Sequence, residues 1–158
     1  DLRELDLYDL KVDDAGLVHL KGATKLRRLS LSGTLVTDTG LDHLASLGAL
    51  EDLSLGRTTV SGFGLGPAPR FAKLKRLNLM CCKITDVNIP NLKHLKALER
   101  LDLTESSITD AGLQQLDGLT NLRELDVRFN KVSAAAVRDL KRAIPKLEVR
   151  GAPEKDEP

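Results

Sequence analysis

A 24-residue period of leucines limits the possible folds of this chain more than any other feature. The leading leucine of the repeat recurs, each time 24 residues after the previous one, at Leu2, Leu26, Leu50, Leu74, Leu98 and Leu122. A fixed period of this length is typical of a solenoid, in which each repeat packs on its neighbours instead of surrounding one central core. The sequence therefore predicts a stack of similar coils.

Within each repeat the apolar spacing changes from that of a strand to that of a helix. If the leading leucine is position 1, positions 4 and 6 are also apolar, and this period of two predicts a short strand. Later in the repeat, Leu113, Leu116 and Leu119 are three residues apart, which favours a short helix. The Thr109–Asp110 pair stands just ahead of it and has N-cap chemistry, as do Thr37–Asp38 and Thr85–Asp86. Stacked repeats of this kind are expected to form a parallel sheet on one face and a helical layer on the other.

The pattern predicts one domain over residues 1–150, made of six repeats and a terminal strand over residues 144–149. Residues 151–158 have the composition of a disordered tail. The third repeat departs from the pattern, because the three glycines and two prolines between Ser61 and Pro69 should weaken or abolish its helix. The chain starts at Asp1, without a methionine and one residue ahead of a repeat, so we expect it to be part of a longer protein.

Composition argues against several classes of partner. The 24 basic and 23 acidic residues give a net charge of +1, whereas nucleic-acid-binding proteins usually carry a basic excess. Only four aromatic residues are present, so stacking platforms for single strands are not expected. No apolar run approaches the roughly 18 residues of a membrane span. The adjacent Cys81 and Cys82 exclude a disulfide framework and favour a reducing compartment such as the cytoplasm, although the compartment itself stays open.

The sequence offers no convincing constellation for catalysis or metal binding. His19 and His43 occupy equivalent positions, but neighbouring helices stand too far apart to complete a four-ligand metal shell easily. The Gly-x-Gly-x-Gly run over residues 62–66 is followed by prolines, so it lacks the helix that a phosphate-binding loop requires. Cys82 is expected to be a buried thiol, with Cys81 pointing outward. We therefore expect a non-enzymatic protein without catalytic residues, metal or cofactor.

Charges at positions 2 and 3 of the predicted sheet face mostly alternate from repeat to repeat. Alternation favours self-paired ladders that keep a flat sheet soluble, each exposed pair contributing a few tenths of a kcal/mol. Like charges adjoin at Arg76 and Arg100 in position 3, and at Asp102 and Asp126 in position 5. These four residues either neutralise one another across the two positions or belong to a recognition patch, in which an aromatic residue beside arginine resembles an interface hot spot. The patch hypothesis comprises Arg76, Met80, Arg100, Asp102, Asp126, Arg128 and Phe129, with Tyr8 as a separate candidate.

The pattern Leu-x-x-Leu-x-Leu-x-x-(Asn/Cys/Thr)-x-(Ile/Val) resembles the leucine-rich repeat family over residues 2–149. In that family position 9 ties the turn to the next repeat, and here it holds Leu10, Thr34, Thr58, Cys82, Ser106 and Asn130. The Thr-Asp-x-Gly-Leu-x-x-Leu half resembles bacterial and F-box-type repeats, with ribonuclease-inhibitor-like helices on the convex side. The resemblance implies a right-handed α/β horseshoe that binds a protein partner on its concave sheet and is a monomer in isolation.

Two other roles stay open at this point. The chain could be the substrate-recruiting arm of a multidomain enzyme, such as a ubiquitin-ligase-type effector or a kinase, with the catalytic part outside these residues. It could also be a surface adhesion domain or a repeat spacer without a defined partner. The sequence does not identify the partner or the organism.

Overall fold

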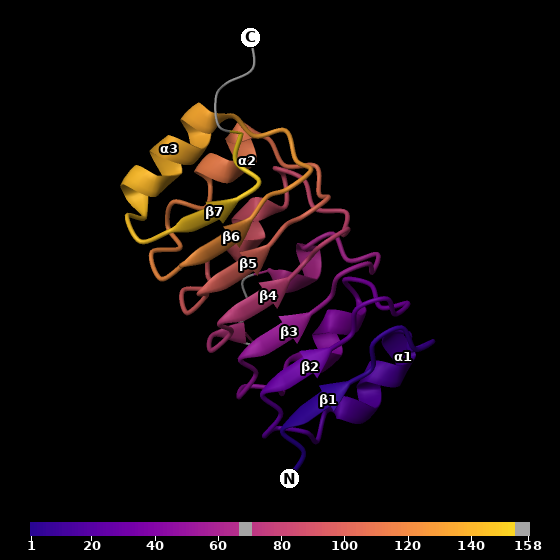
Figure 1. Cartoon of the computed structure of the whole chain (residues 1–158). Coiled ribbons are helices and arrows are strands. Elements are labelled where there is room, and N and C mark those ends of the chain that lie inside the picture. The colour runs from indigo at the N-terminus through magenta and orange to yellow at the C-terminus, as the bar shows by residue number, and fades with distance from the viewer. Residues whose placement is uncertain (67–70, 154–158) are drawn as a thin grey trace.

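The computed structural model describes residues 1–66 and 71–153. These residues contain a seven-stranded parallel sheet whose strands follow one another in chain order (Figure 1). The strands are β1 (Glu4–Asp6), β2 (Arg28–Ser30), β3 (Asp52–Ser54), β4 (Arg76–Asn78), β5 (Arg100–Asp102), β6 (Glu124–Asp126) and β7 (Glu148–Arg150). The helical segments are α1 (Asp14–Leu17), η1 (Val18–Leu20), η2 (Gly40–Leu44), η3 (Phe63–Leu65), η5 (Ile89–Leu92), α2 (Asp110–Gln114) and α3 (Ala134–Ala143), where η denotes a 3₁₀ helix.

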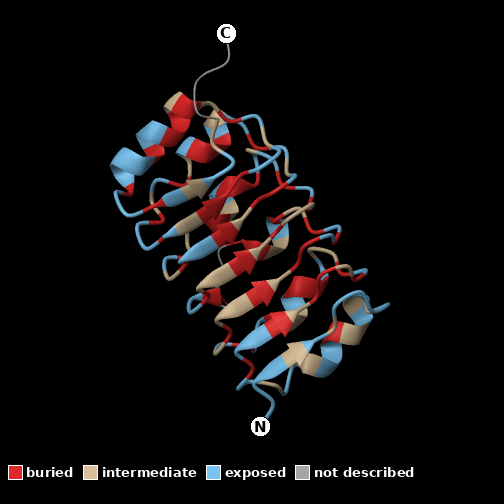
Figure 2. Ribbon diagram, in the orientation of Figure 1, coloured by how far each residue is buried: buried red, intermediate tan, exposed pale blue. Residues whose placement is uncertain are grey.

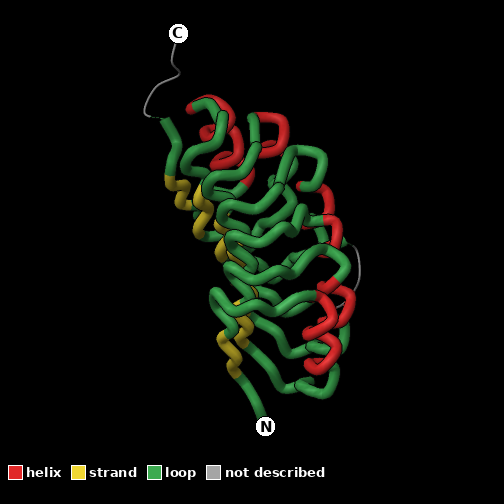
Figure 3. The backbone as a smooth tube through the Cα atoms, turned by 90° about the vertical axis from the view of Figure 1, so that its right-hand side faces the viewer, coloured by secondary structure: helices red, strands yellow, loops and turns green. Residues whose placement is uncertain are grey.

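The strands and the helical segments lie on opposite sides of the coil (Figure 3). Strand register follows the repeat, so that equal positions of successive repeats are direct neighbours, as Leu29 is of Leu53 and Leu53 of Leu77. This arrangement confirms the predicted right-handed solenoid with a parallel sheet on one face.

The leucines of the repeat form one continuous core between the two layers (Figure 2). Leu53 and Leu55 in the third repeat are completely buried. Their equivalents in the first repeat, Leu5 and Leu7, are only partly buried, because the first coil has a neighbour on one side only. Burial therefore comes from the adjacent repeats, as expected for a solenoid.

Side chains at position 9 bind backbone groups around the turn after the strand. The hydroxyl of Thr58 donates to the carbonyl of Leu55 at 2.6 Å within its own repeat. The thiol of Cys82 also donates to Leu55, at 3.1 Å, and so links the fourth repeat to the third. Asn130 links the sixth repeat to the fifth, because its Nδ2 donates to the carbonyl of Leu103 at 2.7 Å. Cys82 is thus a buried structural thiol, and burial raises its pKa.

The two residues of the Thr-Asp pairs have different roles, and only part of the predicted capping is present. Thr109 does cap α2, accepting a hydrogen bond from the N–H of Ala111 at 3.3 Å. The neighbouring aspartates instead bind the next repeat: Asp86 accepts from the N–H of Thr109 at 2.9 Å and from its hydroxyl at 2.5 Å. Equivalent bonds join Asp14 to Thr37, Asp38 to Ser61 and Asp110 to Ser133. Because the capping prediction considered each repeat alone, it missed these links, and η2 and η5 have no side-chain cap.

In the described part of the irregular third repeat, η3 is a short 3₁₀ helix rather than an α-helix. Pro67 and Pro69 lie outside the described residues. Gly62 stands where other repeats carry the linking aspartate, and its φ of 96° is one that glycine tolerates best. In the next repeat Asn88 compensates, because its Oδ1 accepts from the N–H of Thr85 at 3.0 Å and from its hydroxyl at 2.8 Å.

The C-terminal end differs from the predicted terminal strand over residues 144–149. Helix α3 continues to Ala143, and the N–H of Ile144 still donates to the carbonyl of Leu140 at 2.9 Å. The chain therefore needs a turn before it can rejoin the sheet, and the strand covers only Glu148–Arg150. Of the predicted tail, Ala152 packs against the core, and residues 154–158 lie outside the described residues.

Candidate interaction surface

Two rows of side chains project from the sheet face and define the candidate site. Because strand residues alternate between faces, positions 3 and 5 point outward while the leucine at position 4 points into the core. Row 3 contains Glu4, Arg28, Asp52, Arg76, Arg100 and Glu124. Row 5 contains Asp6, Ser30, Ser54, Asn78, Asp102 and Asp126, and Arg150 of β7 continues it.

Charges in row 3 pair along the row, two by two. Arg28 pairs with Glu4, and hydrogen bonding to Glu4 raises the pKa of Arg28. The Nε of Arg76 lies 2.7 Å from Oδ2 of Asp52, and Nη2 of Arg100 lies 3.0 Å from Oε1 of Glu124. The adjoining arginines therefore bind carboxylates on opposite sides, each away from the other.

This pairing bears on one of the two explanations of the like-charged neighbours, their neutralisation across rows 3 and 5. Neutralisation across rows 3 and 5 would require an ion pair from Arg76 or Arg100 to Asp102 or Asp126. No such ion pair within 4.0 Å is present among residues 1–66 and 71–153. The like-charged neighbours in the two rows therefore do not cancel one another directly.

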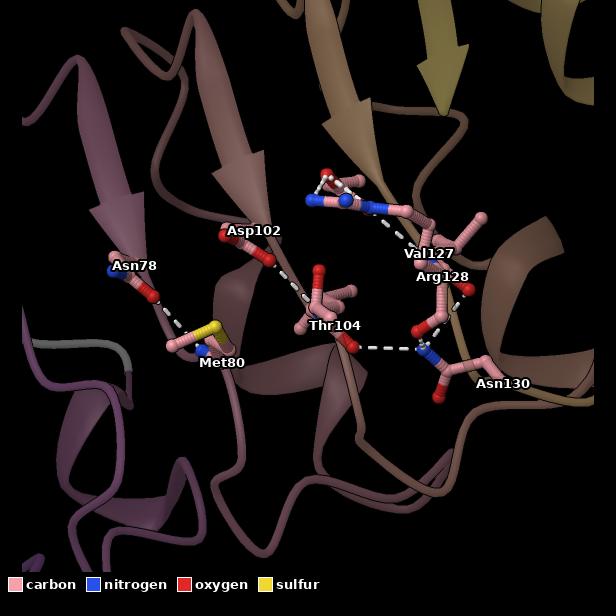
Figure 4. Close-up of polar contacts among 9 residues, drawn as sticks. Asn78, Met80, Asp102, Thr104, Val127, Arg128 and Asn130 are labelled. Carbon is pink, nitrogen blue, oxygen red and sulfur yellow. Dashed lines mark hydrogen bonds and ion pairs between the residues drawn. The ribbon is translucent and has the colours of Figure 1, made fainter. Parts of the chain in front are cut away.

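Side-chain turns follow β4 and β5 in row 5 (Figure 4). Oδ1 of Asn78 accepts from the N–H of Met80 at 2.9 Å, and Oδ1 of Asp102 accepts from the N–H of Thr104 at 2.8 Å. Aspartate and asparagine favour this local bond to the backbone two residues on. The turn fixes the direction in which position 7, including the half-buried Met80, leaves the sheet.

Asp126 forms an ion pair with Arg128 and is the most buried of the seven candidate residues. Nε of Arg128 lies 2.9 Å from Oδ1 of Asp126, and Nη2 lies 2.7 Å from Oδ2, so the pair is bidentate. Burial raises the pKa of the Asp126 carboxyl, but hydrogen bonds from the guanidinium and backbone N–H of Arg128 outweigh it and leave the pKa below its ordinary value. Asp126 thus positions Arg128, whose own side chain remains half exposed.

Position 8 adopts a left-handed backbone conformation in every repeat. Gly33 is the one glycine, and the others, with φ between 53° and 59°, are Asp9, Arg57, Cys81, Glu105 and Phe129. Phe129 combines this conformation with 77% exposure, the highest among the large apolar side chains of the described residues. Left-handed conformation is uncommon outside glycine, asparagine and aspartate and is a genuine outlier for a bulky residue.

The seven candidate residues occupy one end of the sheet face, on β4 to β6 and the turns that follow them. Arg76, Arg100, Asp102 and Asp126 line an open hollow of about 300 Å³. Asp52, Glu124 and Arg150 also line it, and the patch hypothesis did not include them. Asp52 and Glu124 could be recognised in the sequence as members of row 3. Arg150 lines the hollow because β7 pairs with β6.

Other candidates from the sequence have a structural explanation or lie apart. Cys81 donates its thiol to Oε2 of Glu105 at 3.2 Å, and its pKa is raised first by burial and then by this carboxylate. The hydroxyl of Tyr8 accepts from Nη1 of Arg57 at 3.4 Å in the N-terminal half of the sheet face. Within the described residues no three histidine, cysteine or acidic side chains are placed to hold a metal ion. None of the described helices has the length and apolarity to cross a bilayer.

Comparison with known proteins agrees with this geometry. The family model for leucine-rich repeats matches residues 72–132. Among solved structures, an internalin (inlF) from Listeria monocytogenes superimposes with a TM-score of 0.73 at 23% identity, covering 99% of this chain and 49% of the internalin. Internalin C2 (inlC2) from the same organism gives 0.71 at 26% identity, covering 97% of this chain and 64% of that one. The chain thus has the fold of leucine-rich repeat proteins, and residues 72–132 match their family model.

A third structure with a similar fold belongs to a multiprotein complex. A chain of the octameric complex of latrophilin 3, Unc5D and the leucine-rich repeats of FLRT2 matches with a TM-score of 0.71 at 27% identity, covering 96% of this chain and 48% of that one. A search of curated protein sequences found no match. The chain spans less than two thirds of each of these structures. The match to leucine-rich repeats suggests a role in protein–protein interaction.

Proposed function

We propose that the chain is a non-enzymatic protein-binding module whose partner contacts the C-terminal half of the sheet face. The contact patch consists of Arg76, Met80, Arg100, Asp102, Asp126, Arg128 and Phe129. A rigid sheet presents these side chains already in place, so binding orders few of them and loses little conformational entropy.

Phe129 is the observation that carries the proposal. Its ring is 77% exposed, so the aromatic side chain contributes little to the folded core. Its φ of 59° is unfavourable for a residue with a bulky Cβ substituent. Neither packing nor backbone conformation accounts for phenylalanine at this position, whereas binding does, because exposed aromatic residues are frequent interface anchors.

Arg128 supports the same reading. Its guanidinium is fixed by Asp126 through two parallel contacts, yet half of the side chain stays accessible beside Phe129. A fixed arginine next to an exposed aromatic residue combines the two residue types most enriched in binding hot spots. Asp126 contributes by orienting Arg128 rather than by offering a free carboxylate.

The test starts from the partner captured with the full-length protein in its native host. Binding of that partner is then compared for the chain with Phe129→Ala and with the matched control Phe63→Ala, since Phe63 is 63% exposed but lies in η3 among the helical segments. We expect Phe129→Ala to weaken binding about tenfold or more and Phe63→Ala to leave it unchanged. Unchanged affinity for Phe129→Ala together with Arg128→Ala would contradict the proposal.

A further inference from the structure

The two outward rows of the sheet face flank an open groove that runs across the strands. One hollow of about 470 Å³ lies between rows 3 and 5 over β1 to β3, and the hollow of about 300 Å³ lies between the same rows over β3 to β6. Asp52 and Ser54 line both, so the two hollows meet at β3. The groove therefore follows the solenoid axis, with row 3 as one wall and row 5 as the other.

The close spacing of the two rows favours an extended chain over a helix. Rows 3 and 5 are two strand residues apart, or about 7 Å at roughly 3.3 Å per residue. A helix with its side chains is about 10–12 Å wide. An extended chain fits better, and its successive side chains point to opposite sides, one toward each wall.

Over β4 and β5 the row 3 wall is basic. Arg76 and Arg100 are direct neighbours in the sheet register, which places two guanidinium-bearing side chains beside the same stretch of groove. Each binds one carboxylate on its far side, Asp52 at 2.7 Å and Glu124 at 3.0 Å. A guanidinium has five N–H donors, so both side chains keep donors for a further carboxylate between them.

The opposite wall offers a carboxylate at the same level. Oδ1 of Asp102 accepts from the N–H of Thr104, whereas Oδ2 receives no hydrogen bond from any of the described residues. No cation of the described part lies within 4.0 Å of Asp102. Its neighbour Asp126 differs, since Arg128 binds both of its oxygens.

We propose that this groove binds an extended segment of the partner in which an acidic and a basic residue are consecutive. The acidic side chain lies between Arg76 and Arg100 and restores the charge alternation of row 3. The basic side chain points the other way and pairs with Asp102. This inference rests on the proposed protein-binding function and specifies the chemistry of the segment that is recognised.

The test uses a displayed library of random peptides about twelve residues long, selected on the immobilised chain. Enriched peptides are synthesised and their affinities measured for the wild type, Arg100→Ala and Asp102→Asn. Asparagine keeps the oxygen that accepts from Thr104, so the turn is retained while the charge is lost. The matched control is Arg142→Ala with Asp139→Asn, an exposed pair on α3 among the helical segments.

We expect enriched peptides to contain neighbouring acidic and basic residues and to bind each groove variant about tenfold more weakly, with the control pair unaffected. For the wild-type chain, replacing the peptide's acidic residue by its amide should cost as much affinity as Arg100→Ala does. For the Arg100→Ala chain, the same peptide change should cost little further affinity, because the two groups interact with each other. The inference would be overturned if the enriched peptides carried charges of one sign only, or were apolar or helical. It would also be overturned if no enriched peptide bound the groove variants more weakly than the wild type. If partner binding then still depended on Phe129, the protein-binding function would stand without this groove chemistry.

Discussion

The most informative perturbation of this fold is the replacement of Phe129 by glycine and, separately, by alanine. Both changes remove the ring, but only glycine relieves the left-handed backbone at φ 59°. Since the ring is 77% exposed, its loss removes about a quarter of the roughly 2 kcal/mol that full burial of phenylalanine contributes, or about 0.5 kcal/mol.

The backbone contribution decides the difference between the two variants. A left-handed conformation costs a residue with a Cβ atom about 1–2 kcal/mol, and glycine avoids this cost. Glycine in turn loses about 0.5–1 kcal/mol through the greater freedom of its unfolded chain. Phe129→Gly should therefore be about 0.5–1 kcal/mol more stable than Phe129→Ala and close to the wild type, although a large aromatic side chain has been removed.

Thermal unfolding followed by circular dichroism measures this difference, which corresponds to roughly 1–4 °C in melting temperature for a chain of this size. Gly33→Ala at the equivalent position is the reverse control and should destabilise, because an added Cβ would lie 3.0 Å from Oδ1 of Asp9. An alanine variant at 129 as stable as the glycine variant would refute the argument from backbone strain. It would also remove the reason for treating Phe129 as retained for binding.

Three further outcomes are expected from thermal or urea unfolding. Asp86→Gly should destabilise by about 1–3 kcal/mol because it removes the link to Thr109, and Gly112→Asn should do the same because its side chain would overlap the Asp86 carboxylate. The double variant recreates the arrangement of Gly62 and Asn88 and should recover much of the loss. Additive losses in the double variant would contradict this. Asn130→Ala should cost about 2–3 kcal/mol by leaving partly buried backbone groups unpaired, and a loss below about 0.5 kcal/mol would show that water replaces the side chain. Because the pKa of Asp126 is lowered in the folded chain, its ionised carboxylate stabilises the fold above the ordinary aspartate pKa near 3.9, and this stabilisation is lost as pH falls through the lowered pKa. Asp126→Asn should therefore lose less stability than the wild type between pH 7 and pH 2. Equal losses of stability in the two proteins would contradict the lowered pKa of Asp126.

Much of the fold could be predicted because its information is local and repeated. Leucines at positions 1, 4 and 6 bury themselves only if each coil stacks on the next, so six in-phase copies specify a parallel solenoid. The buried role of Cys82 followed from its position in the repeat in the same way.

The candidate site could be predicted only in part. Charge alternation located the like-charged neighbours at Arg76 and Arg100, and the aromatic residue at 129 was visible in the sequence. The ion pair of the buried Asp126 with Arg128 was not, because two residues of one strand end meet only when the turn folds back. For the same reason the capping interpretation of Asp86 failed, since its partner is 23 residues away in the next repeat.

The amino-acid order alone thus settles which side chains face the core and which face outward, because that depends on the alternation of a strand and the period of a coil. Only the folded structure shows with which neighbour each outward charged side chain forms an ion pair. Arg100 is on the same strand as Asp102 and opposite Glu124 on β6. It forms its ion pair with Glu124, which depends on side-chain geometry between repeats. The groove between the rows, and the charges left available in it, are consequences of those ion pairs.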